Sequence, residues 1–295
     1  MKLTIKKLTK TYSNGVKAID NLNLEIGTGM FGLLGPNGAG KSSLMRTIAT
    51  LQRPDSGSIS FGDIDVLSDQ TELRKCLGYL PQSFGVYPKM SAENLLDYLA
   101  TLKGVKSKAD RKKLVDETLT ITNLYDVRKK YVAGYSGGMK QRFGIAQLLL
   151  NNPELIIVDE PTAGLDPAER SRFLNVIREI GTTSTVIFST HIVDDVKELC
   201  TDMAILNGGR ILKHEIPQES LKEFEGKIWN GTIDPDKLET TKSTLNVLSS
   251  NYNQENRMNI RVYSDSKPIG DFEKAVPDLE DVYFYTLKED EAVLA

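Results

Sequence analysis

The chain has few of the features that mark secreted or membrane-spanning proteins. Its 295 residues include only two cysteines, Cys76 and Cys200, which stand far apart. Two such residues do not make a disulfide framework, so we expect buried thiols in a reducing compartment. The sequence opens without a secretory signal, and no apolar run nears the ~20 residues that span a bilayer. These absences predict a protein that is soluble by itself and reaches a membrane only through a partner.

The sequence also lacks the clustered basic segment that binds phosphate backbones. Its net charge is −3. Residues 1–221 carry 28 Lys and Arg against 25 Asp and Glu, whereas residues 222–295 carry 9 against 15. We therefore expect no nucleic-acid partner. The length is typical of one large domain with an appendage, or of two domains.

The strongest positive signal is the glycine-rich loop at residues 35–42. Its pattern is Gly, four residues, Gly-Lys-Ser, and it lies between the apolar run Met30–Leu34 and a predicted helix at Ser43–Ala49. Strand, glycine loop and helix in that order are the context of a phosphate-binding loop. Glycines let backbone N–H groups curl around phosphate oxygens, and the helix N-terminus adds positive potential.

This loop predicts a nucleotide site. Lys41 is placed to reach β- and γ-phosphates, and the Ser42 hydroxyl is placed to bind Mg²⁺. The predicted phosphate-loop residues are Gly35, Pro36, Asn37, Gly38, Ala39, Gly40, Lys41, Ser42 and Ser43.

A pair of acidic residues follows a buried strand. The apolar run Leu155–Val158 ends in Asp159 and Glu160. Two adjacent carboxylates at a strand end rarely serve packing, because both must be satisfied. Beside a phosphate loop, Asp159 would hold Mg²⁺, directly or through water, and Glu160 would polarise the attacking water.

Two other predicted strands also end in polar residues. His191 follows Thr185–Thr190, and Gln82 follows Leu77–Leu80 after one proline. His191 could contact the γ-phosphate, and Gln82 could contact Mg²⁺ or the attacking water, although either residue alone would be read as a surface side chain. The alternation of strands and helices predicts an α/β fold with a parallel sheet and a ligand at the carboxyl ends of its strands.

The remaining segments allow two readings each. Ser136, Gly137 and Gly138 begin a predicted helix that runs through Leu150; they form either a second anion site or a glycine turn that caps the helix. Tyr12 could stack on an adenine ring, or it could simply pack. Other helices are predicted from Ala92 to about Lys103 and over residues 105–130.

Taken together, these motifs resemble the full set found in the ATP-binding cassette (ABC) ATPases, in the family's order over residues 1–215. The resemblance adds the loop Ala163–Asp166. In the family two cassettes face head to tail, and ATP lies between one phosphate loop and the other cassette's signature. ATP and Mg²⁺ are thus the implied cofactors. The resemblance also implies that Ser136, Gly137 and Gly138 bind the γ-phosphate in trans and that Asp166 contributes to the nucleotide site.

The signature departs from the common Leu-Ser-Gly-Gly-Gln pattern at both ends. Tyr135 replaces its first residue and Met139 its last, so the polar contact of the glutamine is lost. The phosphate-contacting Ser-Gly-Gly core is intact.

The resemblance also predicts the domain organisation. Residues 1–221 would form a P-loop NTPase core with a parallel sheet, an N-terminal antiparallel β subdomain and an inserted α-helical signature subdomain at about 85–150. Residues 222–295 would form a small C-terminal α+β appendage, with strands at 228–233 and 258–263. We expect this appendage to stabilise or regulate a dimer, and a chain ending at Leu221 to bind Mg-ATP with similar affinity.

By this resemblance the protein is the ATP-hydrolysing subunit of a transporter. It would act as a homodimer, or paired with a second cassette, on a separate integral-membrane permease, from the cytoplasmic face of the membrane. The segment Pro277–Tyr283 resembles that of stand-alone cassettes of an exporter-type (drug or polysaccharide) branch, which indicates export.

Two alternatives belong to other classes. The first is a soluble cassette ATPase that acts on ribosomes or DNA; such proteins usually have two cassettes in one chain or long coiled-coil insertions, and this sequence has neither. The second is a small P-loop kinase or GTPase, which would leave the Ser-Gly-Gly helix start and His191 unexplained. The sequence does not specify the cargo.

Overall fold

A six-stranded sheet forms the centre of the molecule. The computed structural model describes residues 1–85 and 87–294; Val86, in the predicted helical subdomain, and Ala295, in the predicted appendage, lie outside the described residues. The strands, in sheet order, are β10 (Arg210–Glu215), β9 (Asp202–Asn207), β3 (Gly29–Leu34), β8 (Thr185–Thr190), β7 (Leu155–Asp159) and β6 (Leu77–Leu80). All neighbours pair in parallel except β9 and β10. The predicted parallel sheet is confirmed, and its central strands are buried along their whole length, as parallel strands are.

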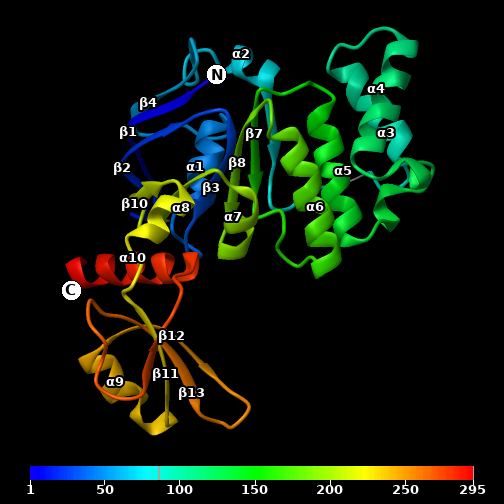
Figure 1. Cartoon of the computed structure of the whole chain (residues 1–295). Helices are drawn as coiled ribbons and strands as arrows, with labels where there is room; N and C mark the ends of the chain where they lie inside the picture. Colours follow the sequence, from blue (N-terminus) through cyan, green and yellow to red (C-terminus); the bar gives the residue numbers. More distant parts are fainter. Residues whose placement is uncertain (86, 295) are drawn as a thin grey trace.

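Helices and a second sheet cover the two faces of this sheet (Figure 1). On one face, α1 (Lys41–Ile48) packs between it and an antiparallel sheet, which α2 (Gln70–Cys76) adjoins. On the other face lie α5 (Gly137–Leu149), α6 (Pro167–Ile180) and α7 (Val193–Leu199). The antiparallel sheet consists of β2 (Lys17–Ile26), β1 (Leu3–Thr11), β4 (Ser56–Phe61) and β5 (Ile64–Asp65). It is the N-terminal β subdomain that the resemblance implied.

A helical unit with a core of its own lies at one end of the molecule (Figure 1). It contains α3 (Ala92–Leu102), α4 (Lys108–Ile121) and the face of α5 that carries Phe143. Two short 3₁₀ helices, η1 (Tyr125–Val127) and η2 (Val132–Gly134), connect α4 to α5. The prediction of a helix over residues 105–130 is therefore wrong beyond Ile121.

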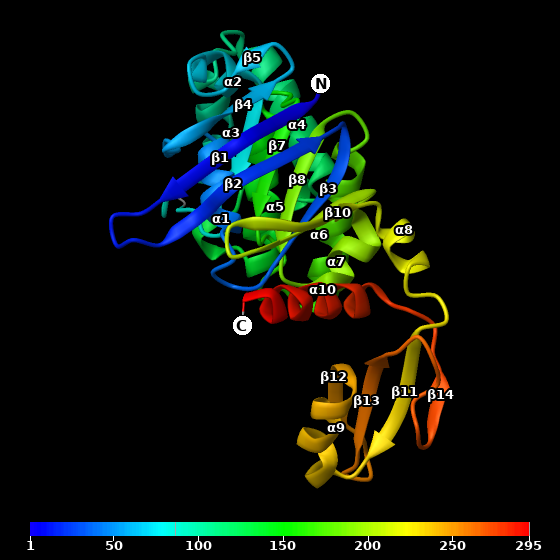
Figure 2. The ribbon, with the colours of Figure 1, turned by 90° about the vertical axis from the view of Figure 1, so that its left-hand side faces the viewer.

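The C-terminal part forms a separate antiparallel sheet and then returns to the rest of the chain (Figure 2). After α8 (Pro217–Lys222), the sheet contains β12 (Asn246–Tyr252), β13 (Met258–Tyr263), β11 (Ile228–Ile233) and β14 (Phe272–Lys274), in that order. Between β11 and β12 lie η3 (Pro235–Lys237) and α9 (Leu238–Thr244). The two strands predicted here coincide with β11 and β13.

The last helix, α10 (Leu279–Leu294), lies between the C-terminal sheet and the six-stranded sheet (Figures 1 and 2). Its residues Leu279, Val282 and Tyr283 belong to the main hydrophobic core, together with side chains of α6 and α7. Burial of these apolar side chains fixes the helix against the first 221 residues, although the sheet before it is separate.

Two expectations from composition can be compared with this structure. Both cysteines are free; Cys200 is buried, which raises the pKa of its thiol, and Cys76 is half-buried. Within residues 1–85 and 87–294, no helix combines the length and the apolar character needed to cross a bilayer.

Candidate active site

The glycine-rich loop joins the end of β3 to the start of α1. Gly40 is the N-cap of α1 and has φ of 109°, a left-handed conformation that side chains rarely adopt. A Cβ atom there would lie 2.2 Å from the Ala18 carbonyl oxygen, which allows only glycine at this position. The loop thus places its backbone at the first turn of α1, where unpaired N–H groups attract anions.

A hollow of about 470 Å³ opens over this loop. It is lined by Tyr12, Val16, Ala18, residues 36–43, Gln82 and Glu160. The structure therefore brings together four motifs that are widely separated in sequence. A larger hollow, of about 840 Å³, lies over β1, β2 and β4, but none of the predicted site residues lines it.

Tyr12 lies at the rim of the smaller hollow. Its hydroxyl is 2.9 Å from the Ser43 Oγ atom and donates to the Gln52 side-chain oxygen at 3.1 Å. These bonds hold the ring beside the phosphate loop, with 36% of the residue exposed. Gln52 and Val16 were not predicted from the sequence, because neither belongs to a motif.

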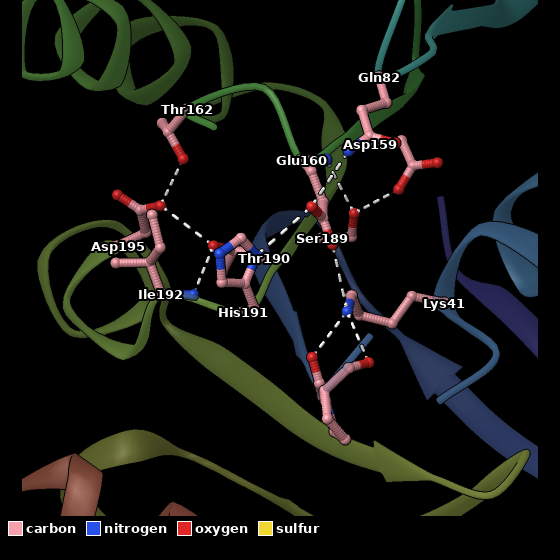
Figure 3. Close-up of polar contacts among 12 residues, drawn as sticks. Lys41, Gln82, Asp159, Glu160, Thr162, Ser189, Thr190, His191, Ile192 and Asp195 are labelled. Atoms are coloured by element: carbon pink, nitrogen blue, oxygen red, sulfur yellow. Dashed lines mark hydrogen bonds and ion pairs between the residues drawn. The ribbon is translucent and has the colours of Figure 1, made fainter. Parts of the chain in front are cut away.

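Three side chains converge on the Glu160 carboxylate (Figure 3). Its Oε1 atom is 3.3 Å from Lys41 Nζ, and its Oε2 atom is 3.4 Å from His191 Nδ1. Gln82 donates to the same Oε2 atom at 3.3 Å. The Glu160 side chain is only 11% exposed, whereas that of His191 is 44% exposed. A shielded carboxylate beside a phosphate loop can act as a general base.

Lys41 is held by the loop itself. Its ammonium group donates to the carbonyl oxygens of Gly35 at 2.6 Å and Pro36 at 3.1 Å. The residue is 4% exposed. The positive charge therefore lies inside the loop, facing the carboxylate of Glu160.

Ser189 is bonded to both residues of the acidic pair, to the Asp159 carboxylate and to the Glu160 backbone. Its hydroxyl donates to Asp159 Oδ1 at 2.7 Å and accepts from the Glu160 backbone N–H at 3.0 Å. Ser189 lies opposite Asp159 in the register of β7 and β8. This residue was not predicted from the sequence, where the only signal is a small polar residue directly after the apolar stretch 186–188.

Glu160 has φ of 46°, in the left-handed region. Such a conformation costs a non-glycine residue roughly 1–3 kcal/mol. The bond from Ser189 to its backbone N–H is one of the contacts that keep the residue there and so aim its carboxylate toward Lys41 and His191.

The predicted signature lies away from this hollow. Ser136 caps α5, and its hydroxyl accepts from the Met139 backbone N–H at 3.2 Å. Asp166 caps α6 in the same way and accepts from the Glu169 N–H at 2.9 Å. None of Ser136, Gly137, Gly138 and Asp166 is among the lining residues of the hollow in the described part of the chain. Within one chain, therefore, the structure does not bring them to the phosphate loop.

Comparison with known proteins decides the family. The ABC transporter family model matches residues 19–163. The uncharacterized ABC transporter ATP-binding protein YxlF of Bacillus subtilis is 36% identical over 210 residues, which cover 71% of this chain and 69% of that protein. The chain belongs to the ABC transporter ATP-binding proteins.

Other relatives and structures agree with this assignment. The bacitracin transport ATP-binding protein BcrA of Bacillus licheniformis is 35% identical over 75% of this chain and 71% of its own length. The methionine import ATP-binding protein MetN 1 of Shouchella clausii is 34% identical, with 64% of its length covered. A dimeric structure of the ATP-binding cassette MJ0796, bound to ADP and Pi, has a TM-score of 0.66 at 28% identity and covers 72% of this chain and 98% of that chain.

These findings confirm the fold class and the ATPase activity that the motifs predicted. The chain is an ABC ATPase cassette with a C-terminal part beyond the region that the family model matches.

The oxygen-bearing side chains in and beside the hollow over the phosphate loop suit Mg²⁺ as ligands. Ser42 and Gln82 line the hollow, and Asp159 lies at the end of β7 beside Glu160. All three offer oxygen atoms, which this hard cation prefers. In the described ranges, no three residues among His, Cys, Asp and Glu gather into a metal cluster.

A buried carboxylate, Asp195, connects the segment that follows β7 with the end of β8 (Figure 3). It is 0% exposed and accepts from the hydroxyls of Thr162 at 2.6 Å and Thr190 at 3.1 Å. Arg170 of α6 donates to its other oxygen at 2.6 Å. Asp195 thus joins the loop after Glu160 to the residue before His191. Asp195 was not predicted from the sequence, because an acidic residue in a short helix is usually exposed.

We expect Asp195→Asn to lower the free energy of unfolding by about 1–3 kcal/mol. The amide keeps the shape but cannot accept from all three donors, and the Arg170 guanidinium loses its counter-charge. Asp194→Asn, one residue earlier and exposed, is the matched control and should stay within about 0.5 kcal/mol. Urea unfolding of both variants measures this difference, and equal stability of the two would contradict the role assigned to Asp195.

Proposed function

We propose that this ABC ATPase binds Mg-ATP in a head-to-tail dimer and drives a separate integral-membrane permease from the cytoplasmic face of the membrane. The dimer is a homodimer or a pair with a second cassette. The observation that carries the proposal is the convergence of Lys41, Gln82 and His191 on the Glu160 carboxylate, directly beside the glycine loop.

Each side chain has a distinct part in this proposal. Lys41 neutralises the β- and γ-phosphates, and the backbone N–H groups at the start of α1 bind their oxygens. Glu160 accepts a proton from the attacking water. Gln82 and His191 orient that carboxylate and the γ-phosphate, while the Tyr12 ring stacks on the adenine.

Magnesium would be held by Ser42, Gln82 and Asp159, and would supply positive charge to the transferring phosphoryl group. Ser189 supports this arrangement because its hydroxyl holds one Asp159 oxygen and leaves the other available.

The distance of the signature from the hollow supports the dimer. Ser136, Gly137, Gly138 and Asp166 are not among the residues that line the hollow of their own chain, and in the proposed dimer a second cassette supplies them. The free N–H groups at the start of α5 would then face the γ-phosphate of the partner's ATP. The MJ0796 cassette, which has the same fold, is described as dimeric.

A mixed dimer tests this arrangement. If one chain carries Lys41→Ala and the other Ser136→Arg, both defects fall in one composite site and the second site stays intact. In a Glu160→Gln background we expect one tightly bound ATP per mixed dimer, and none in either homodimer of the defective chains. Binding stoichiometry on the purified mixed dimer measures this without depending on turnover. Absence of bound ATP in every combination would contradict the sandwich.

The transport role and the direction of transport can be tested only together with the permease. Relatives include proteins named for methionine import and for bacitracin transport, so names alone leave both directions open. We propose export, which is supported by the resemblance of Pro277–Tyr283 to the C-terminal segment of exporter-type cassettes. The transport role is tested by purifying the protein from membranes and identifying the integral protein that accompanies it. The direction is tested by measuring ATP-driven flux in vesicles that contain both proteins. Isolation of a ribosome or DNA complex instead would contradict the proposal.

A further inference from the structure

The hairpin formed by β9 and β10 packs directly on the phosphate loop. In its turn, the Gly209 N–H donates to the Ala39 carbonyl oxygen at 2.9 Å. The Gly209 carbonyl in turn accepts from the Asp20 N–H at 2.9 Å. At the other end of the loop, a Cβ atom on Gly35 would lie 2.4 Å from the Leu206 carbonyl oxygen. The backbone of the loop therefore follows the backbone of this hairpin.

Two side chains on either side of that turn bind one residue of the C-terminal helix. Asn207 ends β9 and Arg210 begins β10, and they pair across the hairpin. Asn207 donates to one carboxylate oxygen of Asp290 at 3.0 Å, and Arg210 donates to the other at 2.8 Å. Asp290 belongs to α10 and is 8% exposed. Because the carboxylate is shielded and both its oxygens are bonded, this is a strong type of contact.

The position of α10 is fixed from two directions. Arg261 of β13 binds Asp281 of α10, which is 1% exposed, so the C-terminal sheet holds the helix. Leu279 and Val282 pack in the main core, so the cassette holds it as well. A second ion pair between cassette and tail, Lys197 to Asp278 at 2.9 Å, lies at the beginning of the helix, far along it from Asp290.

We propose that Asp290 is a positioning residue for the phosphate loop. The helix α10 fixes the turn at residues 207–210, and the turn fixes the loop backbone that surrounds the ATP phosphates. A loop held in its binding conformation loses less conformational entropy when the ligand binds. The C-terminal part of the chain therefore contributes to ATP affinity, although none of its described residues, 222–294, lines the hollow over the phosphate loop. This inference rests on the proposed binding of phosphates by residues 35–42.

The test compares Asp290→Asn with Lys197→Met in the full chain. Each variant weakens one ion pair between cassette and tail, but only the first pair leads to the phosphate loop. We expect Asp290→Asn to weaken binding of a fluorescent ATP analogue about threefold to tenfold. Lys197→Met should change it by less than about twofold, and Asp290→Glu should recover part of the affinity because it restores the charge.

Hydrogen exchange supplies a readout that lost stability alone would not give. The peptide that contains residues 35–42 should exchange faster in Asp290→Asn than in Lys197→Met when the two variants are compared at equal global stability. If Asp290→Asn does not fold, Asn207→Ala removes one of the two bonds and leaves the ion pair. Unchanged ATP affinity together with unchanged exchange of this peptide would overturn the inference.

Lys41→Ala, measured in the same titration, distinguishes a failure of the proposed phosphate site from a failure of the role proposed for Asp290. If Lys41→Ala binds ATP as tightly as the parent chain does, the proposed phosphate site itself fails. If Lys41→Ala loses ATP affinity while Asp290→Asn keeps the parental affinity and the parental hydrogen exchange of residues 35–42, only the role of Asp290 is overturned.

Discussion

Glu160→Gln is expected to lower the rate of ATP hydrolysis by about 10²–10⁴-fold, because a neutral amide cannot accept the proton of the attacking water. The carboxylate is the point where Lys41, Gln82 and His191 meet. The glutamine side chain fills the same space, so the phosphate loop should still bind ATP. If hydrolysis opens the proposed head-to-tail dimer, the variant should also accumulate as an ATP-bound dimer.

Phosphate release at saturating ATP measures the rate, and size-exclusion chromatography with ATP detects the dimer. Glu154→Gln is a suitable control, because Glu154 is exposed and precedes β7 at the end opposite to Glu160. A near-parental rate in Glu160→Gln would show that another group acts as the base.

Lys41→Ala is expected to weaken ATP binding by about 100-fold. The change removes the charge that faces the phosphates. It also removes the donor for the Gly35 and Pro36 carbonyl oxygens, which hold the loop together in this structure. Both losses act on the same loop, so the effect should exceed the threefold to tenfold expected for Asp290→Asn.

Titration with a fluorescent ATP analogue measures this affinity. The control is Lys17→Ala, which removes a lysine between Val16 and Ala18 of the same hollow, but one whose side chain is 53% exposed and pairs with Asp20. Circular dichroism should show that both variants keep the parental secondary structure. Equal affinity in the two variants would contradict the assignment of the phosphate loop.

The sequence predicts the parts of the site that follow strands. Glu160, His191 and Gln82 each come after an apolar run, and parallel strands end at one edge of their sheet. Their convergence could therefore be expected from order alone. That Ser136–Gly138 act in trans, and that Asp166 contributes at all, was in contrast implied only by the family resemblance, because within one chain these residues do not line the hollow.

The contacts that the sequence could not predict join side chains from distant segments of the chain. Ser189 binds Asp159 across 30 positions, and Asp290 binds Arg210 across 80. No local pattern marks such pairs, because each side chain by itself is an ordinary polar residue. The expectation that a chain ending at Leu221 keeps its ATP affinity was made without knowledge of α10, whose Asp290 binds the hairpin of β9 and β10.

The predicted end of one helix was wrong for a local reason. The predicted helix over residues 105–130 ends at Ile121, and Asn123 adopts φ of 54°. Thr122 and Asn123 are weak helix formers, and Asn is among the residues that adopt left-handed conformations. The prediction carried the helix across this break because the segment is charged and has no proline.

The left-handed backbone of Glu160 sets stability against activity at a single position. Glycine adopts this φ without strain, so the residue that folds most easily there is one that cannot take a proton from water. Backbone strain by itself therefore favours loss of the carboxylate, whereas its contacts with Lys41, Gln82 and His191 favour keeping it. Directed evolution for thermal stability would need a hydrolysis screen in every round to retain this residue.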